Sequence, residues 1–157
     1  DLGDSAARFK DLYLSGGVYL GGTGAANKLD DYEVGTFTPV AAGSTTAGTG
    51  TYSKQSGRYT KIGNKVSIEI TLSWSAHTGS GNMEVDGLPF NTNGDRQTFA
   101  VTAESLTYTG EVKVLSYFGN DNFLQIFQQI SNSGLSALPM DSTVSYMVIT
   151  GMYETDS

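Results

Sequence analysis

The residues that combine aromatic rings with short polar side chains are the clearest candidates for chemistry in this sequence. The run YFGNDNF, residues 117–123, falls in a predicted turn, where burying several aromatic rings would be unfavourable. Aromatic faces stack on the apolar faces of sugar rings, and amide or carboxylate groups beside them hydrogen-bond to sugar hydroxyls. Tyr117, Asn120, Asp121 and Asn122 are therefore candidate glycan-binding residues, with a plain surface turn as the alternative.

Trp74 and His77, the single tryptophan and the single histidine, form a second candidate glycan site. They lie where a predicted strand ends and a loop rich in Gly and Ser begins. Trp74 also belongs to the apolar face of that strand, so a core position is its alternative. His77 has two alternatives, a local hydrogen bond and a place on the axis of an oligomer. No G-x-S-x-G motif accompanies His77, and a zinc site with one histidine would need three carboxylates or a second subunit.

Acidic residues form one further cluster, at Asp30, Asp31 and Glu33. Paired carboxylates can hydrolyse a glycosidic bond or bind calcium. No D-x-D-x-D-G calcium loop is present, and solvated carboxylates would equally protect edge strands from aggregation. Glu84 and Asp86 alternate with apolar residues, which predicts the solvated face of a strand. We therefore expect no metal site, no catalytic residue and no enzymatic activity.

The glycine-rich run GGTGAAN, residues 21–27, invites comparison with a nucleotide-binding loop. A Rossmann fingerprint needs Gly or Ala where Asn27 stands, and a βαβ unit around it. Neither is recognisable, and no GK[ST] motif of a P-loop occurs. The run predicts a tight turn, and no cofactor is expected.

The composition favours an all-β chain without nucleic-acid or membrane partners. The 157 residues include 20 Gly, 9 Tyr and 7 Phe but only 16% charged residues, a mixture typical of strands joined by tight turns. The formal charge is −7, and the 9 Lys and Arg residues are scattered, so no basic stripe can bind phosphates. Cysteine is absent, and no apolar run approaches the roughly 20 residues of a membrane helix.

Alternating apolar and polar residues predict strands across most of the chain. The clearest is Lys65–Trp74, in which every second residue from Val66 onward is apolar. Residues 123–130 also fit a helical face, but their aromatic and β-branched content favours a strand. Further strands are expected at 57–62, 83–85, 96–103, 111–117, 122–130 and 144–153, and an exposed loop at 41–50. This spacing predicts an antiparallel β-sandwich, jelly-roll-like in topology.

Residues 9–39 contain apolar runs that are too short to build a core. KDLYLSG and GVYLGG stop at glycines, and the acidic run LDDYEVGTFTP follows them. Such runs bury too little surface to offset chain entropy, so copies of the chain are expected to complete one another's sheets in a homotrimer. The expected division is a short-stranded shaft segment, 1–39, and a β-sandwich domain, 40–157. Because no Met precedes Asp1, we also expect a fragment of a longer protein.

The N-terminal run resembles the linker of bacteriophage tail-fibre proteins, especially those of marine phages. The blocks YTKIGNKVSIEITLSW, GNMEVDGLPF and VSYMVITGMYET, in this order, resemble successive strands of the β-domain that ends such fibres. The chain is thus similar to the C-terminal, distal β-domain of a tail fibre of the marine-phage type. Many similar linkers lead into a self-cleaving chaperone domain, and because none is recognisable here, the resemblance implies a mature tip.

The resemblance implies a structural and receptor-binding module in the virion tail. It would attach the phage to a bacterial surface polysaccharide or another cell-surface receptor, through the turns farthest from the shaft. Its other partners would be copies of itself and the rest of the fibre. Three linked sites per trimer would raise the avidity beyond that of one contact. The alternatives are a fragment of a tailspike-type enzyme that degrades polysaccharide, and a trimerisation or capsid-decoration domain without a ligand.

Overall fold

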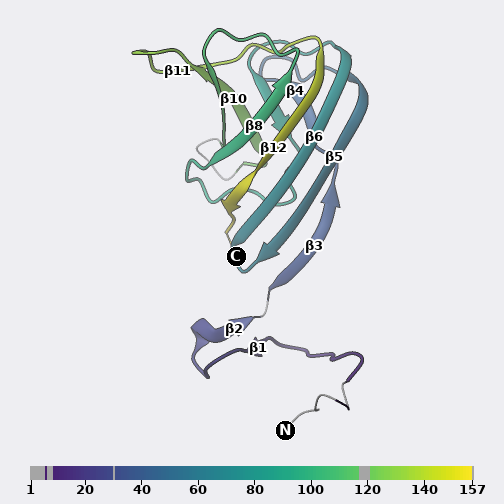
Figure 1. Ribbon diagram of the computed structural model, residues 1–157, viewed down its shortest axis with the longest axis vertical. Helices are drawn as coiled ribbons and strands as arrows, with labels where there is room; N and C mark the ends of the chain where they lie inside the picture. Colours follow the sequence, from purple (N-terminus) through teal and green to yellow (C-terminus); the bar gives the residue numbers. More distant parts are fainter. Residues whose placement is uncertain (1–5, 7–8, 30, 117–120, 157) are drawn as a thin grey trace.

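The computed structural model describes residue 6 and residues 9–29, 31–116 and 121–156 of the chain. These residues form an all-β protein with one short 3₁₀ turn, η1 (Ala25–Asn27) (Figure 1). The strands are β1 (Val18–Tyr19), β2 (Lys28–Leu29), β3 (Tyr32–Phe37), β4 (Val40–Gly43), β5 (Gly50–Ile62), β6 (Lys65–His77), β7 (Met83–Asp86), β8 (Thr98–Glu104), β9 (Glu111–Ser116), β10 (Phe123–Gln129), β11 (Leu135–Ala137) and β12 (Val144–Glu154). No helix among the described residues is long and apolar enough to cross a membrane.

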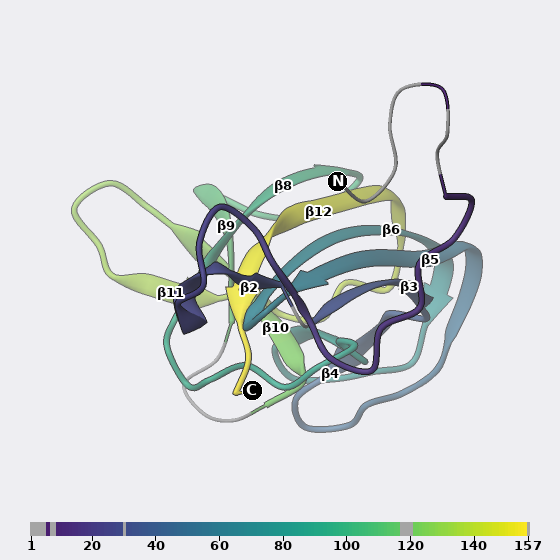
Figure 2. The same ribbon diagram turned by 90° about the horizontal axis from the view of Figure 1, so that it is seen from below.

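Most of the strands belong to a single curled antiparallel sheet. Their order is β3-β5-β6-β12-β8-β9-β10-β7-β4, and β11 is added beside β10. β8 joins the two halves of the curl, because it pairs with β12 over residues 100–104 and with β9 at Thr98 and Phe99. Figure 2 shows from below how the sheet bends around its interior. The prediction of an antiparallel, all-β chain is confirmed.

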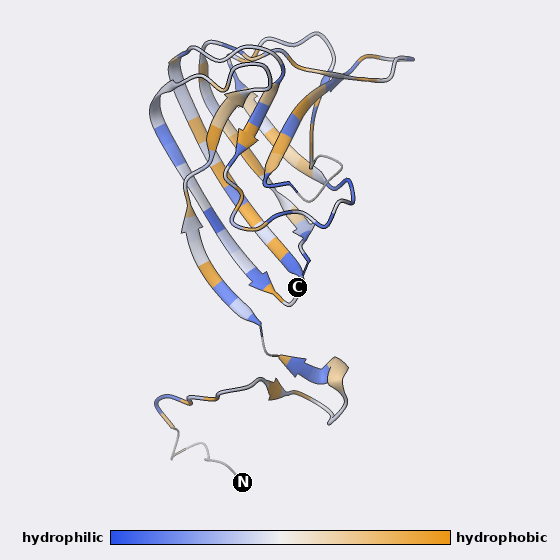
Figure 3. Cartoon of the chain, turned by 180° about the vertical axis from the view of Figure 1, so that it is seen from behind, coloured by the Kyte–Doolittle hydropathy of each residue, from blue (hydrophilic) through white to orange (hydrophobic). Residues whose placement is uncertain are grey.

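The core lies inside the curl and unites residues from both halves of the sheet. On β6, the apolar residues at every second position from Val66 to Trp74 are all buried, as their period of two predicted. They form one cluster with buried residues of β7 and β10, among them Val85 and Ile126. Figure 3 shows the same alternation of apolar and polar residues along the long strands. The strand predicted with the clearest pattern is therefore confirmed.

The other expected strands are present, with changed ends. β5 begins at Gly50, seven positions before the expected start at Gly57. β10 resolves the ambiguous run 123–130 as a strand, because its backbone pairs with β9 on one side and with β7 on the other. A two-residue turn, Gly63-Asn64, joins β5 to β6, and Gly63 adopts a φ of 57°.

The expectation of an exposed loop over residues 41–50 is partly wrong. Ala41 and Ala42 are buried in β4, which pairs with β7, so the exposed loop covers only residues 44–49. Small residues are required in β4, because a Cβ atom on Gly43 would overlap the backbone of Ser80. β3 also differs from expectation: it pairs with β5 and so belongs to the sheet, although its residues fall within the expected shaft segment.

The N-terminal segment, residues 9–29, lies beyond the end of the sheet at which β3 begins (Figure 1). β1 and β2 pair over two residues each, and the chain between them contains η1. The backbone N–H of Asn27 donates to the carbonyl of Gly24 at 2.9 Å, three positions earlier, so the predicted tight turn is confirmed at residues 24–27. The apolar side chains of this segment stay exposed, with Leu12 at 63% and Tyr13 at 91%.

The two ends of the sheet carry different elements. We call the end with the N-terminal segment, the β5–β6 turn and the last residues of β12 the near end, and the opposite end the far end (Figure 1). The far end carries the loops 44–49, 78–82 and 138–143. The backbone N–H of Ser44 donates to Asn82 O at 2.9 Å, and that of Ser80 donates to Thr46 O at 3.0 Å. These bonds fix the first two far-end loops against each other.

Candidate functional site

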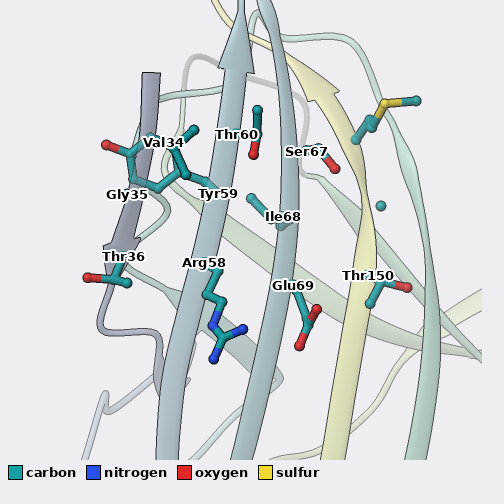
Figure 4. A pocket seen from close by; sticks show the side chains of 12 residues that line it. Val34, Gly35, Thr36, Arg58, Tyr59, Thr60, Ser67, Ile68, Glu69 and Thr150 are labelled. Carbon is teal, nitrogen blue, oxygen red and sulfur yellow. The ribbon is translucent and has the colours of Figure 1, made fainter. Parts of the chain in front are cut away.

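A trough of about 590 Å³ lies on the outer face of the sheet at the near end (Figure 4). It crosses β3, β5, β6 and β12. The strand register places two rows of side chains along it, one with Thr36, Arg58, Glu69 and Thr150 and the other with Val34, Thr60, Ser67 and Met152. Because the trough crosses four neighbouring strands, its shape suits an extended chain better than a compact small molecule.

A first hollow at the far end, of about 460 Å³, is centred on Asp141, and we call it the Asp141 hollow. Its lining comprises Thr107, Thr109, Gln128, Leu138, Pro139, Met140, Asp141 and Ser142. Two backbone N–H groups orient the carboxylate, since Thr107 donates to Oδ2 at 2.9 Å and Thr143 donates to Oδ1 at 3.2 Å. The Oε1 atom of Gln128 accepts from the backbone N–H of Thr109 at 2.9 Å. The amide NH₂ is therefore the group that Gln128 can offer to a ligand.

A second far-end hollow, of about 450 Å³, is lined mainly by serine and threonine residues, and we call it the serine hollow. Its lining comprises Ser53, Ser73, Trp74, Ser75, Ser105, Thr143 and Ser145. Ser73 Oγ donates to Ser145 O at 2.8 Å and lies 2.7 Å from Ser53 Oγ. Ser105 Oγ and Ser145 Oγ lie 2.9 Å apart. Because each hydroxyl can both donate and accept, this lining is compatible with a ligand rich in hydroxyls.

The candidate residue Trp74 is a core residue. It contributes to the lining of the serine hollow, but only 1% of its surface is exposed. Its Nε1–H donates to Asp141 O at 3.1 Å, and its ring meets the ring of Tyr52 edge-on, with 6.3 Å between the centroids. An indole buried to this degree presents no face on which a sugar ring can stack. Trp74 therefore occupies a core position, which was the alternative to a role in glycan binding.

The candidate residue His77 closes β6 and makes local hydrogen bonds. It is 8% exposed, and the backbone N–H of Gly79 donates to its Nδ1 at 2.9 Å. Its Nε2 lies 2.9 Å from the carbonyl oxygen of Ala41. A neutral ring with its proton on Nε2 satisfies both contacts. His77 therefore ties the 78–82 loop to β4, which matches the local-bond alternative and leaves little of the ring for a ligand.

The structure does not bring the two predicted glycan sites together. β6 ends at the far end, whereas β9 ends at the near end, because β6, β12, β8 and β9 are each antiparallel to the next. Tyr117 and Asn120 lie outside the described residues. The backbone carbonyls of Asp121 and Asn122 accept from Thr92 N at 2.8 Å and from Leu88 N at 2.9 Å. Asp121 and Asn122 therefore lie at the near end and not among the turns farthest from the N-terminal segment.

The acidic residues that follow the N-terminal segment make specific contacts with β5. Asp31 forms an ion pair with Lys61, and Glu33 accepts a hydrogen bond from the hydroxyl of Tyr59. Asp30 lies outside the described residues. Within the part of the chain that the structure describes, no three His, Asp or Glu side chains are grouped to hold a metal ion. These contacts fasten the start of β3 to the sheet.

Glu84 and Asp86 form a pair of carboxyls on the outer face of β7. Burial raises the pKa of Glu84, and the neighbouring charge of Asp86 raises it further, although a hydrogen bond from Gln125 acts in the opposite direction. Burial also raises the pKa of Asp86. Folding therefore favours the protonated forms. Their contribution to stability is fully present below the pKa values of the unfolded chain and is lost as the pH rises through the folded-state values.

Replacing Glu84 by Gln is expected to raise the melting temperature by about 1–3 °C at pH 7, because it removes a carboxylate that folding disfavours. The difference should shrink as the pH falls toward the unfolded carboxyl pKa. Thermal melts of both proteins between pH 3 and pH 8 measure it. Glu104→Gln, an exposed carboxyl at the end of β8, controls for the loss of one negative charge. An equal rise in melting temperature from both substitutions at pH 7 would contradict a raised pKa of Glu84.

Comparison with known proteins shows a shared fold but does not assign the chain to a family. No protein-family model matches the chain, and no curated protein sequence matches it. Among solved structures, the crystal structure of the Dettilon tailspike protein (gp208) is similar, with a TM-score of 0.58 and 20% sequence identity. The match covers 78% of this chain and 24% of that chain, so this chain spans about a quarter of the tailspike's length. The two proteins share this fold.

Proposed function

We propose that this chain is a receptor-binding module of a bacteriophage tail fibre or tailspike, which attaches the virion to a bacterial surface glycan. The arrangement of the molecule carries the proposal: an exposed apolar segment leaves one end, and hollows lined by hydroxyl, amide and carboxylate groups occupy the other. The fold shared with part of a tailspike protein supports a place in the virion tail. The N-terminal segment connects the module to the rest of the fibre, and β3, which follows it, belongs to the module's own sheet.

The glycan binds at the far end, which is the end that a fibre attached through its N-terminal segment turns toward the cell. The carboxylate of Asp141 is oriented by two backbone donors and accepts from sugar hydroxyls. The amide of Gln128 donates to them, and the serine hollow offers groups of both kinds. Tyr117, Asn120, Asp121 and Asn122 remain a second candidate sugar contact, and the two of them that the structure describes, Asp121 and Asn122, lie on the near-end side.

The module works as a homotrimer and without catalysis. Three copies on one fibre raise the effective affinity of individually weak glycan contacts. In each protomer the core lies between the two halves of the curled sheet, which supports the proposal of a jelly-roll-like sandwich. Glycoside hydrolysis generally requires two carboxyls across one bond. The described lining of the trough includes the single carboxylate Glu69, and that of the Asp141 hollow includes Asp141 alone.

A second candidate function is polysaccharide cleavage, and the pair Glu84 and Asp86 favours it. Two neighbouring carboxyls with raised pKa values are a feature of glycosidase sites. The assay is incubation with bacterial surface polysaccharide, with chain length followed by size-exclusion chromatography. Shortening that disappears in the Glu84→Gln variant would establish cleavage and overturn the non-catalytic proposal.

Gln128→Ala is expected to weaken glycan binding at least tenfold, because it removes the amide donor of the Asp141 hollow, and to lower the melting temperature only slightly, because the exposed Thr109 loses its acceptor. A panel of bacterial surface polysaccharides first identifies one that the parent protein binds. Titration of parent and variant with that polysaccharide then gives the two affinities.

Gln129→Ala is the matched control, because its side chain lies on the opposite face of the same strand. The control should bind like the parent. Equal binding by both variants would exclude the Asp141 hollow as the site. A trimeric parent that binds no polysaccharide in the panel would favour the alternative of an assembly domain without a ligand.

A further inference from the structure

Exposed apolar side chains gather at the near end of the molecule. Val34 and Met152, one at each end of a row along the trough, are 60% and 61% exposed. Tyr32 and Ile62, on the same outer face, are 63% and 51% exposed. The N-terminal segment beside them adds Phe9, Leu12, Tyr13, Leu14, Val18, Tyr19, Leu20 and Leu29. Exposed apolar surface gathered in one place is characteristic of a binding surface.

β3 adds an unpaired strand edge to this surface. It is the end strand of the sheet path and pairs with β5 over six residues, from Tyr32 to Phe37. Exposed edges usually carry charged residues, prolines or bulges that prevent association. On β3 the outward positions Tyr32, Val34 and Thr36 are uncharged, and the one charged residue of the strand, Glu33, accepts a hydrogen bond from the hydroxyl of Tyr59. This edge is therefore open to a partner chain.

The segment from Lys10 to Leu14 matches the trough in length and in chemistry. Its four steps in extended form span about 13 Å, and crossing from β3 to β12 spans three strand spacings, about 14 Å. Lys10, Leu12 and Leu14 would share one face of the extended segment. That face offers two apolar side chains and one cation to a trough that carries the apolar Val34 and Met152 and one pair of opposite charges, Arg58 and Glu69.

We propose that residues Lys10–Leu14 of a second copy of this chain lie in the trough, so that each N-terminal segment holds a neighbouring subunit by the outer face of its sheet. The proposal rests on the homotrimer of the proposed function and assigns its contact surface. Leu12 and Leu14 lose their exposure in this contact, and so do Val34 and Met152 at the two ends of the row they cover. The far-end hollows stay free, so assembly and glycan binding use opposite ends of the protein.

Site-specific disulfide cross-linking tests the contact, because the chain has no cysteine of its own. A Leu14→Cys chain with one affinity tag is co-expressed with a Val34→Cys or a Met152→Cys chain that carries another tag. After oxidation with copper phenanthroline, a denaturing gel shows whether the two tags share one band. The pair Leu14→Cys and Leu135→Cys is the control, because Leu135 is an exposed apolar residue of β11.

We expect more than half of the chains to cross-link between Leu14→Cys and at least one of the two trough positions, and none with Leu135→Cys. Light scattering of the parent protein distinguishes a failure of the trough contact from a failure of the proposed assembly. An oligomer whose trough pairs cross-link no better than the control overturns the trough contact and leaves the proposed assembly standing. A mass of 16.6 kDa, that of one chain, overturns both. A disulfide confined to one chain in a Leu14→Cys/Val34→Cys double variant shows that the segment fills its own trough, and also overturns the proposal.

Discussion

Trp74→Ala is expected to destabilise the fold by about 3–5 kcal/mol, the range for deleting a large aromatic side chain from a packed core. The indole is 1% exposed, and its N–H donates to the backbone carbonyl of Asp141. The rings of Tyr52 and His77 meet it edge-on, with centroids 6.3 and 6.1 Å away. The substitution therefore leaves a cavity in the core and removes the donor of the partly buried Asp141 carbonyl.

Urea unfolding followed by far-ultraviolet circular dichroism measures this loss, because the chain has no other tryptophan to report by fluorescence. Parent and variant must be compared at equal protein concentration, since association contributes to stability. Trp74→Phe should fall between them, because it keeps an aromatic ring but loses volume and the N–H donor. A loss below about 1 kcal/mol, together with lost glycan binding, would instead make Trp74 a ligand contact.

The local sequence pattern was sufficient to predict a strand and its buried residues wherever that strand had one buried and one exposed face. β6 shows this, because its period of two both forms the strand and fixes which residues face the core. β4 shows the opposite case. Ala41 and Ala42 look like loop residues in the sequence, yet they are buried because the 78–82 loop and β7 pass close to them. Elements that are distant in sequence pack closely against these positions and leave room only for small side chains.

The residues of the candidate site were harder still to predict from the sequence, because the topology of the sheet brings them together. Ser53 and Ser145 line one hollow although they are 92 positions apart, and no spacing of serines in the sequence connects them. Asp141 was recognisable only as a turn residue, and its role as an oriented carboxylate depends on the N–H of Thr107 from another loop. The same limit applies to Asp121 and Asn122: their residue types could be read from the sequence, but the end of the sheet at which they lie follows from the antiparallel order of strands far apart in the chain.

Gly48→Ala is expected to destabilise the protein by about 2–5 kcal/mol and to weaken glycan binding. Gly48 has a φ of 75°, which costs an L-residue about 1–2 kcal/mol. A Cβ atom there would also overlap the backbone of Gly79 in the neighbouring loop, and backbone displaced by added volume typically costs about 1–3 kcal/mol more. The strain reaches the site through that loop, because Met140 N donates to Gly81 O at 2.8 Å beside Asp141.

Gly63→Ala separates the two causes of this loss. Gly63 has a similar backbone conformation, with a φ of 57°, but a Cβ atom there would meet nothing within 4 Å. It should therefore cost only the conformational penalty, about 1–2 kcal/mol, and leave glycan binding unchanged. Chemical denaturation and polysaccharide titration of both variants measure the comparison. Equal losses of stability with intact binding in both would mean that the two far-end loops do not hold the Asp141 hollow in shape, and the glycan site would have to be sought away from them.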